Sequence, residues 1–143
     1  MSRSGYNDGD GDQWGMICWR GAVKSALRGK RGQEFLKELA VAMDAMPVKR
    51  LVAEELQADG EFCTLGVVGH ARGMDMGKID PDDSEFVAEQ FGIAESMTRE
   101  IVWENDEHPG IYDQVSGWRR ETPEERWKRM RNWVDSQIVQ VAP

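Results

Sequence analysis

The sequence predicts a mainly α, compact single-domain fold of five or six helices, with one short β hairpin near residues 50–65. Apolar residues recur at helical spacing through most of the chain, and glycine or proline separates the helical segments. Only residues 49–68 are a plausible β region. The 143 residues are enough for one hydrophobic core, and no linker divides them. We therefore expect a flexible lead-in at residues 1–11 and a single helical domain at residues 12–140.

The first two helices are predicted at about residues 13–27 and 32–46. The apolar face of the first consists of Met16, Trp19, Val23, Ala26 and Leu27, and that of the second consists of Phe35, Leu36, Leu39, Met43 and Met46. Glycine interrupts the chain between them, and Pro47 ends the second helix. We expect an antiparallel helix pair with residues 28–32 at its tip.

Positive charge is concentrated at this tip. The basic patch consists of Arg20, Lys24, Arg28, Lys30 and Arg31. Glycine beside these residues would let backbone N–H groups approach an anion closely, although the phosphate-loop motif is absent. Two interpretations stay open: a solvated helix–helix turn, and a contact for nucleic acid or an acidic partner. In a nucleic-acid contact, Arg126 and Arg129 of the last helix would add to the basic patch.

The region from 49 to 68 contains Asp59-Gly60, a dipeptide typical of tight hairpin turns. The segment that follows it, residues 62–68, fits either a return strand or the start of a helix. The residues alone leave this choice open.

A helix is predicted to begin at Asp80-Pro81, with Asp80 as the N-cap, and Gly92 is predicted to break it. A second helix follows over residues 94–103. The spacing in residues 87–94 is that of a helix-turn-helix, but Glu95 and Glu100 would give the reading helix the wrong charge for DNA. We interpret this unit as packing.

The centre of the chain is strongly acidic. Residues 51–110 contain fifteen acidic and three basic side chains, a formal charge of −12. The candidate acidic binding face consists of Asp80, Asp82, Asp83, Glu85, Glu89, Glu95, Glu104, Asp106 and Glu107. Residues 104–108 place carboxylates beside a histidine, which could hold a divalent metal, but a solvated loop explains them as well. Broad nucleic-acid binding through this region is disfavoured.

The last helix is predicted to start at Thr122-Pro123, because Thr122 and Glu125 have the spacing of a capping box. Its apolar positions are Trp127, Met130, Trp133, Val134 and Ile138. The preceding segment, residues 109–118, is predicted to be a loop.

Few other motifs are present. Cys18 and Cys63 match no zinc or redox spacing, so we expect both to be small buried residues. No apolar run has the length of a membrane span, and we expect a soluble, cytoplasmic protein with no membrane contact. No catalytic motif is evident, and we expect no enzyme activity, no metal and no cofactor. Homo-oligomerisation stays open.

Two resemblances add to these expectations. The stretch from Gly60 to Val68 resembles a Gly-x-Tyr-Cys-x-Leu-Gly pattern of small phage-encoded proteins, in which a short strand leads directly into a helix. This implies a helix from about Phe62 to Ala71. More widely, the chain is similar to an uncharacterised family of bacteriophage and prophage proteins in residues 19–33, 71–75, 91–94, 104–107 and 121–126. This resemblance implies a viral or mobile-element origin and transfers no activity or functional residue.

We expect a non-enzymatic phage or prophage accessory protein that binds a host or phage protein through the acidic face. One form of this function is inhibition of a host defence or nucleic-acid-processing system. A nucleic-acid-binding accessory protein that uses the basic patch is the alternative. A metal-dependent hydrolase built on Glu104, Asp106, Glu107 and His108 is a second alternative.

Overall fold

The computed structural model describes residues 3–4, 13–107 and 110–140. It is mainly helical, which confirms the predicted fold class. The helices are α1 (Gln13–Arg28), α2 (Lys30–Asp44), α3 (Thr64–Ala71), the short 3-10 helix η1 (Met76–Lys78), α4 (Ser84–Phe91), α5 (Glu95–Asp106) and α6 (Pro123–Gln137). The strands are β1 (Gln57–Ala58), β2 (Glu61–Phe62), β3 (Ile111–Asp113) and β4 (Gly117–Arg119).

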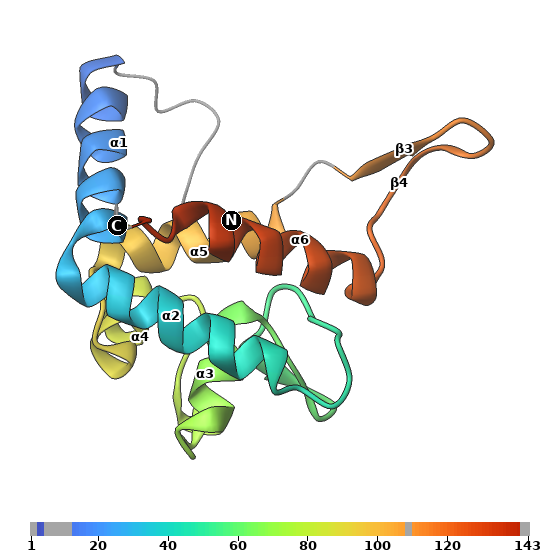
Figure 1. The fold of residues 1–143 in the computed structure, drawn as a ribbon, viewed down its shortest axis with the longest axis horizontal. Coiled ribbons are helices and arrows are strands. Elements are labelled where there is room, and N and C mark those ends of the chain that lie inside the picture. Colours follow the sequence, from blue (N-terminus) through green and yellow to red (C-terminus); the bar gives the residue numbers. More distant parts are fainter. Residues whose placement is uncertain (1–2, 5–12, 108–109, 141–143) are drawn as a thin grey trace.

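Helix α5 lies at the centre of the fold. Helices α1, α3, α4 and α6 all contact it, and α2 packs against α3 and α6 (Figure 1). The largest fully buried side chains come from α2 to α6 and from the chain before β1, and are Leu36, Leu39, Met43, Leu51, Leu65, Val68, Val87, Phe91, Met97, Ile101, Met130 and Val134. Burial of each of these side chains contributes roughly 1.5–3 kcal/mol to the stability of the folded state.

The corner between α1 and α2 differs from the predicted antiparallel pair. Only Gly29 separates the two helices, and it is the N-cap of α2 rather than the end of a turn. One residue is too short to reverse the chain, so α2 turns away from α1 (Figure 1). Gly32 lies inside α2, where a Cβ would come 1.9 Å from the carbonyl oxygen of Ala26. Glycine is therefore needed here for close packing of the two helices.

Residues 49–68 contain both structures that the sequence left open. Strands β1 and β2 form an antiparallel hairpin with Gln57 opposite Phe62. Asp59 and Gly60 connect them with positive φ angles of 51° and 78°. The next residue, Cys63, caps α3, and its Sγ accepts a hydrogen bond from the backbone of Gly66 at 3.4 Å.

A second hairpin, β3–β4, occupies the segment predicted to be a loop. Tyr112 pairs with Trp118, and Asp113 pairs with Gly117. The hairpin projects from the body of the protein (Figure 1). The prediction was wrong because glycine favours a loop in general, whereas Gly117 has a positive φ of 75° at the start of β4, a conformation that glycine adopts without strain.

Helix α4 begins three residues later than predicted. Asp83, not Asp80, is the N-cap, and its Oδ1 accepts a hydrogen bond from the backbone of Phe86 at 3.1 Å. Gly92 ends the helix in the left-handed conformation, as expected. Helix α5 then continues to Asp106, beyond the predicted end at Trp103. Since α5 is buried among four helices, it serves packing and not DNA reading.

Helix α6 begins as predicted, with Thr122 and Glu125 forming a capping box. Its arginines do not all stay on the surface. Arg129 Nη1 donates to the backbone oxygen of Glu104 at 2.7 Å, and Arg126 Nε donates to that of Asn105 at 3.1 Å. These guanidinium groups cap the C-terminal end of α5, where cations are favourable.

Part of the predicted lead-in is also packed. Arg3 and Ser4 are 7% and 1% exposed, so the expectation of a flexible segment was wrong for these two residues. Residues 1–2 and 5–12 lie outside the described part of the chain.

Candidate functional site

Six of the predicted acidic residues form one exposed surface around α4. Asp80 and Asp82 precede the helix, Asp83 caps it, Glu85 and Glu89 lie on it, and Glu95 begins α5. All six side chains are exposed. We call this set the acidic strip: Asp80, Asp82, Asp83, Glu85, Glu89 and Glu95.

Three carboxylates of the acidic strip also have local roles. Asp80 accepts from the backbone of Asp82 at 2.9 Å, Asp83 caps α4, and Glu95 accepts from the hydroxyl of Ser84 at 2.9 Å. Their positions near helix N-termini are favourable for negative charge. For Asp82, Glu85 and Glu89, by contrast, the described residues offer no structural partner.

The acidic strip contains no cation of its own, although Arg31 and Arg72 line one hollow together with Glu89. Residues 79–95 contain no lysine or arginine, and no strip carboxylate forms an ion pair with any residue in the described ranges. Phe86 lies within this surface and is 39% exposed. The surface therefore combines unneutralised negative charge with one accessible aromatic ring.

The remaining predicted acidic residues belong to a different, structural site. Asp106 accepts two hydrogen bonds from Arg3, each 2.8 Å long, and a third from the backbone of Glu54 at 3.0 Å. The Arg3 and Asp106 side chains are 2% and 6% exposed. Glu107 accepts a hydrogen bond from Ser4. These carboxylates are not part of an exposed face, so their assignment to the binding face is corrected.

Glu104 is half-buried beside Arg129, with 3.7 Å between the charged groups. Burial raises the pKa of its carboxyl, and the nearby Glu100 raises it further, while Arg129 acts in the opposite direction. The expectation of a solvated loop was wrong here, because residues 104–106 form the last turn of α5.

Asn105 links this structural site to the core. Its Oδ1 accepts from the backbone and hydroxyl of Thr64, at 3.1 and 2.8 Å, and its Nδ2 donates to the backbone oxygen of Val52 at 3.0 Å. Asn105 is 1% exposed. One amide thereby holds together α5, the start of α3 and the chain before β1. Sequence reasoning did not single out this residue.

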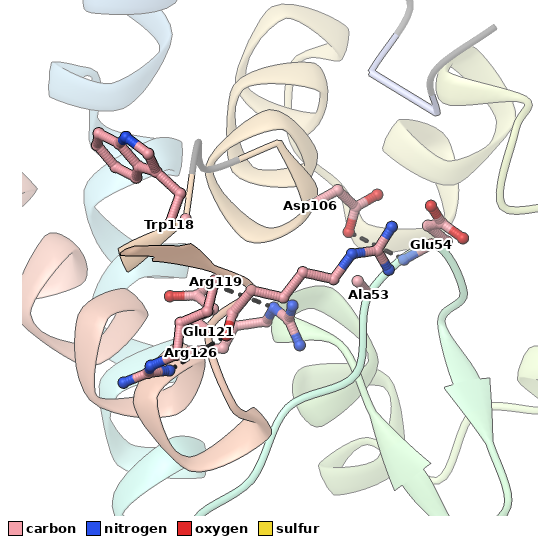
Figure 2. Close-up of a pocket in the computed structure, with 9 residues that line it drawn as sticks. Ala53, Glu54, Asp106, Trp118, Arg119, Glu121 and Arg126 are labelled. Carbon is pink, nitrogen blue, oxygen red and sulfur yellow. Dashed lines mark hydrogen bonds and ion pairs between the residues drawn. The ribbon is translucent and has the colours of Figure 1, made fainter. Parts of the chain in front are cut away.

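A cavity of about 600 Å³ lies between this site and the β3–β4 hairpin (Figure 2). Asp106, Glu121 and Arg126 face it together with Trp118 and Arg119 of the hairpin. Several of its charged groups are paired: Arg126 contacts Glu121 at 3.4 Å, and Arg119 contacts Glu125 at 2.8 Å. Glu54 and Arg120 also line the cavity.

No group of three or more histidine, cysteine, aspartate or glutamate side chains in the described ranges is placed to hold a metal ion. His108, which the sequence placed beside Glu107, lies outside these ranges.

The basic patch is divided by the fold. Arg20 turns toward α5, where its Nη1 lies 2.9 Å from a carboxylate oxygen of Glu100, a residue that is 4% exposed. The other four cations, Lys24, Arg28, Lys30 and Arg31, are exposed, and none forms an ion pair with a described residue. They surround the N-terminus of α2, which has no side-chain cap. Arg126 and Arg129 donate hydrogen bonds to the C-terminal end of α5 and do not extend the patch.

Sequence reasoning missed two apolar surfaces. The projecting hairpin exposes Tyr112, Val115 and Trp118, at 61%, 96% and 70%. A groove of about 690 Å³ lies between the end of α2, the β1–β2 hairpin and α3, with Met46, Phe62 and Val67 among its lining residues. The alternation around Tyr112 and Trp118 could have indicated the hairpin. The groove has no local signal, because three separate elements form it.

Cys63 is buried as expected, but Cys18 is exposed on α1. None of the described helices is long and apolar enough to cross a membrane. Comparisons of the chain with protein-family models, with curated proteins and with solved structures found no match. The phage resemblance therefore stays a prediction, and function must be argued from the surfaces described above.

Proposed function

We propose that this protein is a non-enzymatic binding protein whose acidic strip engages a positively charged surface of a partner protein. One observation carries the proposal: six exposed carboxylates occur between residues 80 and 95, and none of them forms an ion pair with a described residue. A surface of this kind steers a basic partner toward the protein and disfavours acidic ones.

Phe86 gives the acidic strip an apolar contact point. Aromatic side chains are enriched where binding energy is concentrated, and surrounding charges provide orientation and association rate. The partner that fits best is a protein with a basic face and a small apolar depression. In view of the phage resemblance, we propose a host or phage protein, and nucleic-acid-processing proteins are the class whose basic surfaces match most directly.

The test is capture of partners from a host lysate at low and high salt, with Glu85→Lys and Glu55→Lys compared. Both residues are exposed, and both changes alter net charge equally. We expect wild type to retain a stoichiometric partner that is released by salt, Glu85→Lys to lose it and Glu55→Lys to keep it. Equal retention by the two variants, or no salt-sensitive partner, would contradict the proposal.

A second candidate function is supported by the four exposed cations at the α1–α2 corner. Lys24 and Arg28 lie in the last turns of α1, Lys30 and Arg31 begin α2, and the N-terminus of α2 has no side-chain cap, an arrangement that suits phosphate. Fluorescence anisotropy with labelled DNA and RNA at low salt tests it. Nucleic-acid binding should fall steeply with salt and disappear in a Lys30→Glu/Arg31→Glu variant. Binding that is unchanged in this variant would reject the corner as the site.

A further inference from the structure

The β3–β4 hairpin, which we call the arm, extends from the protein with an apolar outer face. Tyr112 and Trp118 lie opposite each other on it, and their rings meet edge to face with 5.5 Å between centroids. Both rings are exposed, and Val115 at the tip is 96% exposed. On the other face of the arm, Arg119 pairs with Glu125 of α6 at 2.8 Å. Because a two-stranded hairpin alone is only marginally stable in water, a cover over the aromatic face would stabilise the arm.

The apolar groove between the end of α2, the β1–β2 hairpin and α3 is suited to receive such a face. Phe62 lines it and is stacked on His70, with 4.6 Å between ring centroids. Val48, another lining residue, is 60% exposed. The groove measures about 690 Å³. This volume lies within the range of roughly 300–1,000 Å³ that encloses small organic ligands, so aromatic side chains can enter it.

The arm and the groove lie at the same end of the molecule. Arg50, which lines the groove, pairs with Glu124 in the first turn of α6 at 2.7 Å. Residues 120–122 alone connect the arm to that turn. The arm points away from the body of its own chain (Figure 1). A second copy facing this end could therefore receive the arm and return its own.

We propose that two copies of this protein form a dimer by exchanging arms, so that the apolar face of each arm packs into the groove of the other copy. One two-fold axis produces both contacts, which makes the interface closed and limits the assembly to two copies. The inference does not depend on the acidic strip or on the function proposed for it.

The area that arm exchange buries is sufficient for a dimer. Tyr112, Val115 and Trp118 are 61%, 96% and 70% exposed. Since an aromatic side chain buries on the order of 200 Å², these three residues offer roughly 400 Å² per arm. The groove loses a similar area and the contact occurs twice, so the total is roughly 1,600 Å², the typical size of a specific protein–protein interface.

Charge also favours a second copy as the occupant. The outer face of the arm has no charged side chain, and Arg50 and Glu61, which line the groove, pair with each other at 2.8 Å. Arg120 follows the arm and Asp59 lies beside the groove; both are exposed, and neither forms an ion pair with a residue that the structure describes. Exchange brings this cation and this carboxylate to facing copies, which is favourable.

Sedimentation equilibrium of the full chain is the first test. Interfaces of this area have micromolar or tighter dissociation constants, so the 16.2 kDa monomer should convert to dimer in the micromolar range. A wild-type protein that stays monomeric at several hundred micromolar would overturn the proposal and leave the arm and the groove to other proteins.

Matched variants test the two surfaces. Val115→Asp changes the arm and Val48→Asp changes the groove, and both positions are exposed, so the circular dichroism spectrum should stay unchanged. Each variant should raise the dissociation constant by about a hundredfold or more, because each dimer places two unpaired charges in the interface. Ile17→Asp makes the same change on α1, where Ile17 is 57% exposed, and should leave the dimer intact. A dimer that survives both Val115→Asp and Val48→Asp, or that Ile17→Asp dissociates, would overturn the proposal.

A mixing experiment distinguishes arm exchange from other interfaces. Val115→Asp keeps an intact groove, and Val48→Asp keeps an intact arm. A mixed dimer of these two variants therefore has one wild-type contact, whereas each variant alone has none. The equimolar mixture should associate about tenfold or more tightly than either variant alone. A mixture that associates no better than its components would overturn the exchange.

Thiol labelling supplies a second measurement. A Val115→Cys/Cys18→Ser variant has one accessible thiol, at the tip of the arm, because Cys63 is 1% exposed. Its reaction rate with a maleimide should fall severalfold as the protein concentration is raised through the dissociation constant. Adding Val48→Asp to this variant should restore fast labelling. A rate that is independent of concentration while the protein dimerises would place the interface elsewhere.

Discussion

Asp106 and Glu85 illustrate how burial divides the carboxylates of one acidic region. Asp106 is held by Arg3 and by backbone donors, with its side chain 6% exposed. Glu85 is exposed on α4 and has no described partner. Asp106 therefore stabilises the fold, and Glu85 is available for binding. At the scale of single residues, function therefore depends on environment and not on residue type.

The Asp106→Ala variant should lose about 3 kcal/mol of unfolding free energy, because it leaves the buried guanidinium of Arg3 without its counter-charge. Urea denaturation measures the loss. In the Arg3→Ala/Asp106→Ala double variant, the loss should be smaller than the sum of the two single losses. Glu85→Ala is the control and should change stability by less than about 0.5 kcal/mol. Additive losses for Arg3 and Asp106 would show that the pair is not coupled.

The Glu104→Gln variant should alter the pH dependence of stability across the range in which Glu104 ionises in the folded protein. Burial raises the pKa of Glu104 in the folded protein above its value in the unfolded chain. The folded state therefore holds the proton more tightly, and this contribution is present at low pH and is lost as the pH rises through the folded pKa. Glutamine cannot ionise, so the variant should gain stability relative to wild type as the pH rises through the raised pKa of Glu104. A constant difference between the two proteins from pH 4 to 8 would contradict this expectation.

At the scale of elements, the path of the chain depends on a few close contacts. Gly32 permits the α1–α2 corner, and the arginines of α6 cap the end of α5. The sequence predicted where α1, α2 and α6 lie, because amphipathic periodicity and the Thr122 capping box are local signals. It did not predict the direction of α2, which is set by the single residue between the helices. It also missed β3–β4, because Gly110 and Gly117 favour a loop and outweigh the short alternation around Tyr112 and Trp118.

The Gly32→Ala variant should lose about 2 kcal/mol or more of stability, because its Cβ would lie 1.9 Å from the Ala26 carbonyl oxygen and the helices would have to separate. Gly21→Ala is the matched control in α1. Its Cβ meets no neighbour, so better helix propensity should make stability equal or up to about 1 kcal/mol higher. Thermal and urea unfolding measure both. Equal effects of the two substitutions would contradict the close packing at Gly32.

At the scale of the whole molecule, charge is segregated. The net charge is −8, yet six carboxylates without an ion pair among the described residues gather at the acidic strip, and four exposed cations gather at the α1–α2 corner. Buried pairs such as Arg3–Asp106 are screened little by salt, whereas exposed like charges repel over about 10 Å at 0.1 M salt. Self-repulsion within the strip therefore opposes folding at low ionic strength.

Raising sodium chloride from about 20 mM to about 300 mM should raise the melting temperature by roughly 3 °C. An Asp82→Asn/Glu85→Gln variant should melt higher than wild type at low salt and respond less to added salt, because two repelling charges are absent. Differential scanning calorimetry provides both values. If salt instead lowers the melting temperature, attractive surface pairs dominate the electrostatics of the fold.

The helical class, the positions of most helices and the acidic middle of the chain follow from the sequence alone, because periodicity, caps and charge are properties of neighbouring residues. Which charges are available depends on the folded structure. Asp106 is buried against Arg3, Arg20 is directed toward Glu100, and the acidic strip stays exposed. These outcomes depend on contacts between residues about 80 to 100 positions apart. No local pattern contains that information.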